Sequence, residues 1–378
     1  MSDGGAVLTV PKAVAEYPLP AAAQTHEVAY PGNNLLVVTQ QTDSVLVQVA
    51  LDPATGRPLE AAGHRVGTPR SGLHGLFASQ VSPGCVWTTL QFDDKLLLVQ
   101  PGPSVDAPPA VLREIAIPAP ARGPHVVVEY GDDLWTTCKD SSHVVRVSAS
   151  NPSDVSVYPC SRRPIFVARH PASGRVYASL DRSSSILGID PGTGSTWEVA
   201  VPAEHGTTPV GLVAGPDGNV WFVLLGGSSG GTGTFAKIAA DGALVWYRLT
   251  TGTASGAGLI HLAWSTSAEG EPLLWLLASS ISNMMLPNAV VRVTFQDDYG
   301  AIATQETVSL PTQMCMSHRV LPVGGSLYVS EMMSSVIAHI PVARASTPPV
   351  DEASDYYADY GLGQPASHLV YADPYGPA

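Results

Sequence analysis

The chain has 378 residues, of which 45% are hydrophobic and only 13% are charged. This composition is typical of a globular protein with a large core and excludes an intrinsically disordered chain. The formal net charge of −13 argues against nucleic acid and anionic membrane surfaces as partners, because phosphate groups are bound by basic surfaces.

The first 20 residues contain no basic region followed by a long apolar run, so we expect no signal peptide. No stretch reaches the roughly 18 apolar residues of a membrane span. We therefore expect a cytoplasmic, monomeric protein without a membrane partner. The cysteines lack the C-x-x-C spacing of a metal site, and we expect four free thiols, at Cys85, Cys138, Cys160 and Cys315.

One strand pattern recurs seven times along the chain. A turn precedes an apolar strand that usually has Trp or Tyr at its third position, and the copies lie at 33–39, 84–90, 132–138, 174–180, 218–224, 272–278 and 325–331. A second strand follows every copy, and a further strand follows most of them. The period of roughly 40–57 residues is close to that of propeller blades.

These repeats predict an all-β fold, a seven-bladed β-propeller with four-stranded blades that covers residues 1–343. A four-stranded meander cannot bury both of its faces alone, whereas seven meanders packed radially bury all of them around a central channel. The last repeat lacks an outer strand, and segment 13–26 resembles segment 112–125. We therefore expect residues 13–20 to pair with residues 336–342 and close the ring; a β-sandwich is the alternative.

The last segment, 344–378, differs in composition, because it is acidic and rich in proline and tyrosine. It is expected to be either a disordered tail or an ordered arm that lies across the propeller.

Histidine recurs near the start of the first strand of five repeats. The aligned positions are His26, His74, His125, Ile165, Val210, His261 and His318, although the chain has only 11 histidines. The first strand of a blade is the innermost, so this register predicts a ring of imidazoles at one mouth of the channel. Imidazoles suit proton transfer and metal ligation, because their pKa lies near neutrality. The alternative is a structural role, in which each histidine binds the loop before its strand.

The end of the second strand of each blade returns to the same face. The residues aligned there are Thr39, Leu90, Cys138, Leu180, Leu224, Ala278 and Glu331. Glu331 is the only carboxylate among them, and beside His318 and His26 it is expected to orient an imidazole or bind a cation. A solvated carboxylate at the rim is the alternative.

All methionines after Met1 fall in three loops, 281–288, 313–317 and 331–334, which the meander topology places on the histidine face. They are Met284, Met285, Met314, Met316, Met332 and Met333. Thioether side chains form adaptable apolar surfaces, so these loops are expected to be one wall of a pocket for a bulky ligand. Packing of loop against loop is the alternative.

The segment "VAGPDGNVWF" at 213–222 resembles the repeat of the streptogramin lyases, the virginiamycin B lyase family. The resemblance spans most of residues 15–343 and is closest in the fifth repeat. It implies a propeller that opens a cyclic depsipeptide at its ester by elimination, with Mg²⁺, a catalytic histidine and glutamates. Pro124-His125 matches the Pro-His of the family, but only Glu331 matches its glutamates, which puts the Mg²⁺ site in doubt.

Our leading interpretation is an enzyme of natural-product metabolism that acts on a bulky apolar small molecule. Its acid–base reaction would be that of a lyase, an isomerase or a cyclase, and its catalytic residues would come from the five histidines and Glu331. The reaction would need no cofactor unless the Mg²⁺ of the resemblance is retained. A histidine-ligated metal oxygenase and a non-catalytic binding propeller are the alternatives.

Overall fold

The computed structural model describes residues 14–22, 24–226, 231–250 and 252–342. The segment 344–378, expected to be a tail or an arm, lies outside the described residues. None of the helices in the described ranges is long and apolar enough to cross a membrane. All four cysteines are free, as the sequence predicted.

The described residues form seven four-stranded antiparallel sheets, and the predicted seven-bladed propeller is confirmed. Blades 1 to 3 contain, from the inner to the outer strand, β2 (Thr25–Gly32), β3 (Leu35–Gln40), β4 (Val45–Leu51) and β5 (Pro58–Arg65); β6 (Leu73–Ala78), β7 (Val86–Leu90), β8 (Lys95–Gln100) and β9 (Ala110–Ala116); and β10 (Pro124–Tyr130), β11 (Asp133–Cys138), β12 (His143–Ser148) and β13 (Val155–Pro159).

Blades 4 to 6 follow the same order. They contain β14 (Pro164–Arg169), β15 (Val176–Leu180), β16 (Ser185–Ile189) and β17 (Thr196–Ala200); β18 (Pro209–Ala214), β19 (Val220–Leu224), β20 (Thr234–Ile238) and β21 (Leu244–Arg248); and β22 (Leu259–Thr266), β23 (Pro272–Ala278), β24 (Ala289–Phe295) and β25 (Ile302–Ser309). Three short 3₁₀ helices lie in connections, at Gln91–Asp93, Thr253–Gly256 and Asp297–Tyr299.

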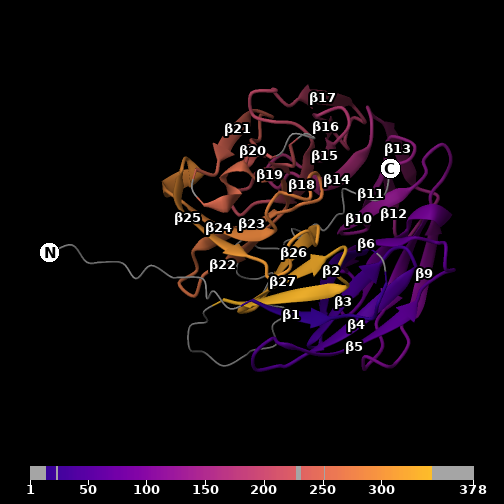
Figure 1. The fold of residues 1–378 in the computed structure, drawn as a ribbon. Coiled ribbons are helices and arrows are strands. Elements are labelled where there is room, and N and C mark those ends of the chain that lie inside the picture. Colours follow the sequence, from indigo (N-terminus) through magenta and orange to yellow (C-terminus); the bar gives the residue numbers. More distant parts are fainter. Residues whose placement is uncertain (1–13, 23, 227–230, 251, 343–378) are drawn as a thin grey trace.

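Blade 7 joins the two ends of the described chain. Its strands are β26 (Ser317–Val323), β27 (Ser326–Glu331) and β28 (Val336–Pro341), and the outer strand is β1 (Ala15–Pro18). Ala15 pairs with His339 and Pro18 with Val336, as the expected pairing of 13–20 with 336–342 requires. Figure 1 shows the result, because the yellow strands of blade 7 lie beside the indigo β1 and β2 and complete the ring.

Burial explains why the inner strands are nearly continuous apolar runs. Both faces of β6, β10 and β18 are buried between neighbouring blades, whereas the outer strand β17 alternates between exposed and half-buried residues. The aromatic residue at the third position of the repeat fills the space between blades, and Trp87, Trp135, Trp221 and Trp275 are at most 2% exposed. Both faces of each sheet are buried only when all seven blades are present.

Removing the outer strand of blade 7 is expected to destabilise the whole ring. Deletion of residues 1–20 removes β1 and exposes the edge of β28, which then lacks a partner for its backbone groups. Differential scanning calorimetry should show a melting temperature lower by roughly 5 °C or more, since each lost kcal/mol lowers it by a few degrees in a domain of this kind. Deletion of residues 1–12 is the matched control and should change little; equal melting temperatures for both deletions would argue against closure by β1.

Candidate active site

Each inner strand contains a β-bulge directly after its first residue. The first residue pairs with the end of the second strand, and the register then shifts within the next two residues; the shifts lie at Thr25/Val28, Leu73/Leu76, Pro124/Val126, Pro164/Val167, Pro209/Leu212, Leu259/His261 and Ser317/Arg319. A bulge sets two residues against one and re-aims their side chains. The bulges therefore define two layers of side chains around the axis.

The first of these layers, the histidine layer, follows the first residue of each inner strand. Its members are His26, His74, His125, Ile165, Val210, Ile260 and His318. The next residue of each strand belongs to the second layer, the axial layer, whose members are Glu27, Gly75, Val126, Phe166, Gly211, His261 and Arg319. Four histidines on the neighbouring blades 7, 1, 2 and 3 thus share one layer.

The strand registers correct two of the expected alignments. β22 begins at Leu259, which pairs with Ala278, so Ile260 occupies the position that the sequence assigned to His261. His261 therefore belongs to the axial layer. In blade 1, Thr25 pairs with Gln40, so Gln40 rather than Thr39 occupies the end of the second strand. Glu331, which pairs with Ser317, remains the only carboxylate at that position.

The four histidines of blades 7, 1, 2 and 3 form a continuous cluster. The ring of His26 stacks on that of His318 with 4.7 Å between centroids, and the ring of His74 stacks on that of His125 with 4.2 Å. His26 and His74 meet edge to face, with 2.9 Å between Nδ1 of His26 and Nε2 of His74. The predicted gathering of these four imidazoles is therefore present.

For the two central histidines, hydrogen bonds determine which tautomer each ring adopts when it is neutral. Nδ1 of His74 lies 2.9 Å from the backbone carbonyl oxygen of His125, which can only accept, so Nδ1 of His74 donates. Nε2 of neutral His74 must then accept a hydrogen bond from Nδ1 of His26. As a result, the basic nitrogen of neutral His26 is Nε2.

The depth of the cluster differs from the expectation. All five predicted histidines and Glu331 are 0% exposed, so the imidazoles do not line an open mouth of the channel. The physical reason is that the imidazole rings cover one another's faces. In addition, hydroxyl groups from the second strands of the blades form hydrogen bonds with the backbone at the bulges. Thr39 donates to the carbonyl oxygen of His74 at 2.7 Å, and Ser330 donates to that of His26.

Side chains of the axial layer cross the centre of the ring. The guanidinium of Arg319 in blade 7 lies over the ring of Phe166 in blade 4, 5.1 Å from its centroid, and the ring of His261 in blade 6 stacks on Phe166 at 5.9 Å. Blade 4 is a neighbour of neither blade 6 nor blade 7, so these contacts span the axis. The expected open channel is therefore filled by side chains at this level.

A fully buried ion pair completes the axial layer. Nε of Arg319 lies 2.9 Å from Oε2 of Glu27, Nη2 contacts the same oxygen, and both side chains are 0% exposed. Glu27, Phe166 and Arg319 were not among the residues predicted to lie at the centre. The signal for two of them was present, because a charged residue directly follows histidine within an apolar strand in "THEVAY" and "SHRVLP".

Glu331 lies in a buried acidic corner. The hydroxyl of Ser334 donates to Oε2 of Glu331 at 2.7 Å, and the carboxylate also lies close to Glu16 of β1 and to the thiol of Cys315. Burial raises the pKa of Glu331 to about 7 against the effect of the Ser334 hydrogen bond, and the negative charge of Glu16 adds to the increase. Glu331 is thus partly protonated at neutral pH.

The residues of the described structure do not fit the Mg²⁺ site that the resemblance implies. Among the described residues, no group of three histidine, cysteine, aspartate or glutamate side chains is arranged to hold a metal ion. The four clustered histidines contact one another through their ring faces and edges. In the described blades, no other second strand ends in a carboxylate that could bind a metal ion together with Glu331. The same arrangement speaks against a histidine-ligated iron.

The methionine loops lie on the histidine face, as expected. They connect β23 to β24, β25 to β26 and β27 to β28, at the end of the propeller where the inner strands begin. Met285, Met333, Met314 and Met284 are 86%, 60%, 55% and 38% exposed, Met316 is half-buried and Met332 is buried. The backbone N–H groups of Met332 and Met333 donate to Met316 and Cys315, which links two of the loops.

Comparisons with known proteins support the fold. No protein-family model matches the chain, and no curated protein matches its sequence. A solved streptogramin B lyase structure is 18% identical, with a TM-score of 0.64 over 88% of this chain and 98% of the lyase. A catalytically inactive virginiamycin B lyase from Staphylococcus aureus with quinupristin is 15% identical, with a TM-score of 0.66 over 88% of this chain and 99% of that one.

A structure described as YCF48 bound to D1 peptide is also similar, with 12% identity and a TM-score of 0.58 over 90% of this chain and 100% of that one. The chain is thus a seven-bladed propeller that matches the virginiamycin B lyase structures at low sequence identity. At this level of identity the likeness establishes the fold alone, because one propeller scaffold serves many functions.

The raised pKa of Glu331 predicts a pH dependence of stability. A carboxyl group whose pKa is higher in the folded state than in the unfolded state stabilises the fold below the unfolded pKa, and this contribution is lost as the pH rises through about 7. Glu331→Gln should therefore raise the melting temperature relative to the unmodified protein at pH 8 more than at pH 5. Glu204→Gln, at an exposed position, is the control; a shift that does not depend on pH would contradict the assignment.

Proposed function

We propose that this protein is a small-molecule enzyme that performs acid–base chemistry, as a lyase, isomerase or cyclase, on a bulky apolar substrate at the histidine face. The observation that carries the proposal is the hydrogen-bonded pair of His26 and His74. A fixed tautomer gives His26 a defined basic nitrogen, and an imidazole held in this way suits a general base.

In the proposed reaction Nε2 of His26 removes a proton from a carbon beside a carbonyl group. The electron pair of that C–H bond forms a carbon–carbon double bond, and in an elimination the neighbouring carbon–oxygen bond breaks and its electron pair leaves with the oxygen. His26, now an imidazolium, still donates its Nδ1 proton to His74. Glu331 in its protonated form would supply a proton to the departing oxygen, or to another carbon in an isomerisation.

Access to the buried imidazoles would come from the methionine loops. The backbone N–H of Thr25, next to His26, donates to the carbonyl oxygen of Met332, and Met316 lies two residues before His318. Binding of an apolar substrate would displace these loops, and the substrate would cover the methionine side chains that are otherwise exposed to water. Substrate binding would thus uncover the base and exclude water in one step.

No step of this proposal requires a metal ion. A histidine-ligated oxygenase would require bound iron, so elemental analysis of the purified protein separates the two: metal in less than one-tenth of the molecules supports the acid–base enzyme, and stoichiometric iron would favour the oxygenase.

The exposed methionines also favour a second candidate, a propeller that binds a partner without turnover. An apolar patch of adaptable side chains is typical of a binding surface. A ligand that raises the melting temperature and is recovered unchanged would support this candidate over the enzyme.

Replacing the proposed base should strongly reduce turnover with little loss of structure. The protein is incubated with macrocyclic esters, quinupristin among them, and with polyene natural products, and isomeric or dehydrated products are sought by liquid chromatography and mass spectrometry. His26→Gln should lower the rate roughly 10²–10⁴-fold, the usual contribution of a general base. His205→Gln, which changes a histidine stacked on Trp246 outside the cluster, should retain activity.

Glutamine is chosen because alanine would leave a cavity at this buried position. Nitrogen-15 NMR of the histidine side chains provides a test that needs no substrate: neutral His26 and His74 should both be protonated at Nδ1. Turnover that survives His26→Gln, or a different tautomer at His74, would refute the proposed base.

The methionine wall predicts where the substrate binds. Met285→Asp or Met333→Asp should weaken binding of any substrate found in the screen by about tenfold, because each places a charge in an apolar contact. Both side chains are more than half exposed, so the melting temperature should hardly change. A dissociation constant equal to that of the unmodified protein would place the substrate elsewhere.

A further inference from the structure

A pocket of about 440 Å³ opens on the face opposite to the histidines, between blades 3 and 4. It is lined by the last residues of the inner strands, Tyr130 of β10 and Arg169 of β14, and by the loops that follow them. Histidines lie at the starts of inner strands, so the pocket and the histidine cluster occupy opposite ends of the propeller. Its volume is within the usual range of small-molecule sites.

The pocket is lined by an indole N–H whose tryptophan counterparts in three other blades all donate a hydrogen bond. The indole N–H of Trp87 donates to Glu129 at 2.7 Å, that of Trp221 to Asp217 at 2.9 Å, and that of Trp275 to Ser265 at 2.7 Å. Trp135 occupies the same position in blade 3, is 2% exposed and lines the pocket, and no described residue accepts a hydrogen bond from its Nε1–H. An indole N–H that lines a pocket and lacks a protein acceptor can donate a hydrogen bond to a ligand there.

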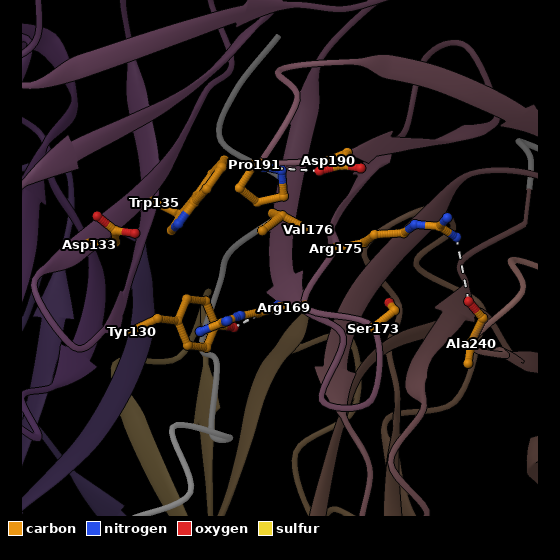
Figure 2. Close-up of a pocket in the computed structure, with 12 residues that line it drawn as sticks. Tyr130, Asp133, Trp135, Arg169, Ser173, Arg175, Val176, Asp190, Pro191 and Ala240 are labelled. Atoms are coloured by element: carbon orange, nitrogen blue, oxygen red, sulfur yellow. Dashed lines mark hydrogen bonds between the residues drawn. The ribbon is translucent and has the colours of Figure 1, made fainter.

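Two further donors lie beside Trp135. The hydroxyl of Tyr130 accepts a hydrogen bond from the backbone N–H of Arg169 at 2.8 Å, which leaves its own proton available, and burial raises its pKa so that it stays protonated. The Arg169 side chain is exposed, and within the described ranges no carboxylate forms an ion pair with it. In Figure 2 the Arg169 side chain extends toward Tyr130, on the same side of the pocket as Trp135.

The acidic residues of the pocket are already engaged. Oδ1 of Asp133 lies 2.6 Å from Nη2 of Arg146, and Oδ1 of Asp190 accepts the backbone N–H groups of Gly192 and Thr193. Asp190 has no cationic partner among the described residues, and two guanidinium groups, those of Arg169 and Arg175, line the pocket without an ion pair there. Arg175 donates to the carbonyl oxygen of Ala240 at 3.4 Å, whereas the side chain of Arg169 is exposed. Pro191 and Val176 supply an apolar wall beside Trp135, as Figure 2 shows.

From these contacts we propose that the pocket binds a small planar organic anion, whose carboxylate or phosphate accepts hydrogen bonds from Trp135, Arg169 and Tyr130. A guanidinium favours such oxyanions through charge-assisted hydrogen bonds. The planar apolar part of the ligand packs against Pro191 and Val176. This site is separate from the proposed active site and does not depend on it.

The test uses benzoate and phenyl phosphate as probes, with neutral benzamide as the isosteric control. Each is titrated into the full chain labelled with nitrogen-15 at tryptophan, and the indole N–H signal of Trp135 is assigned by its loss in Trp135→Phe. At least one anion should move this signal along a saturable curve, and benzamide should bind at least tenfold more weakly. The stronger of the two anions identifies the acid group as a carboxylate or a phosphate.

Arg169→Gln should weaken the anion at least tenfold, whereas Arg182→Gln, which changes an exposed arginine of the same blade outside the pocket, should not. Calorimetric titration of the two arginine variants needs no assignment and serves if Trp135→Phe fails to fold. The proposal is overturned if neither anion gives a saturable shift of the Trp135 signal, or if Arg169→Gln binds the anion as tightly as the unmodified protein.

Discussion

The ion pair between Glu27 and Arg319 joins the first blade to the last at the centre of the ring. Both side chains are fully buried, and a buried charge is costly unless its partner is in place. Because Glu27 lies on β2 and Arg319 on β26, the pair can form only when the ring is closed. The outer pairing of β1 with β28 closes the same blade at the rim. The ion pair therefore stabilises closure near the axis, and the strand pairing stabilises it at the rim. In a partly closed ring the two charged side chains would lie in apolar surroundings without each other.

The bulges that place this pair also create the histidine layer. Four neighbouring blades contribute histidine to the layer, and the other three contribute Ile165, Val210 and Ile260. The layer thus has a polar half, in which imidazoles contact one another, and an aliphatic half. Phe166 extends from the aliphatic side beneath Arg319, so the apolar half also covers the ion pair. This asymmetry distinguishes the centre from that of a propeller with equivalent blades, and it adds support to the proposal of acid–base chemistry there.

The fold could be predicted from the sequence because its signal is local and repeated. Each blade has its own turn, apolar strand and aromatic residue, and the missing outer strand of the last repeat predicted closure by residues 13–20. The register of His261 could not be predicted in this way, because Leu259 and Ile260 are both apolar and either could have begun β22. The burial of the imidazoles and the contact of Phe166 with Arg319 depend on side chains from distant blades meeting at the axis. No sequence pattern predicts such contacts between distant blades, although the charged residues that follow His26 and His318 were an indication of them.

Because side chains fill the axis, no open channel connects the two faces of the described propeller at this level. An open channel would connect the histidine face with the pocket around Trp135, whereas Glu27, Phe166, His261 and Arg319 separate them. One covalent link is the inner strand β10, which contains His125 near its start and ends at Tyr130. That strand is buried on both sides and paired along its length with β11, so it offers no second arrangement through which one site could alter the other. The two proposed sites therefore lie at opposite ends of the ring, and only blade 3 contributes residues to both.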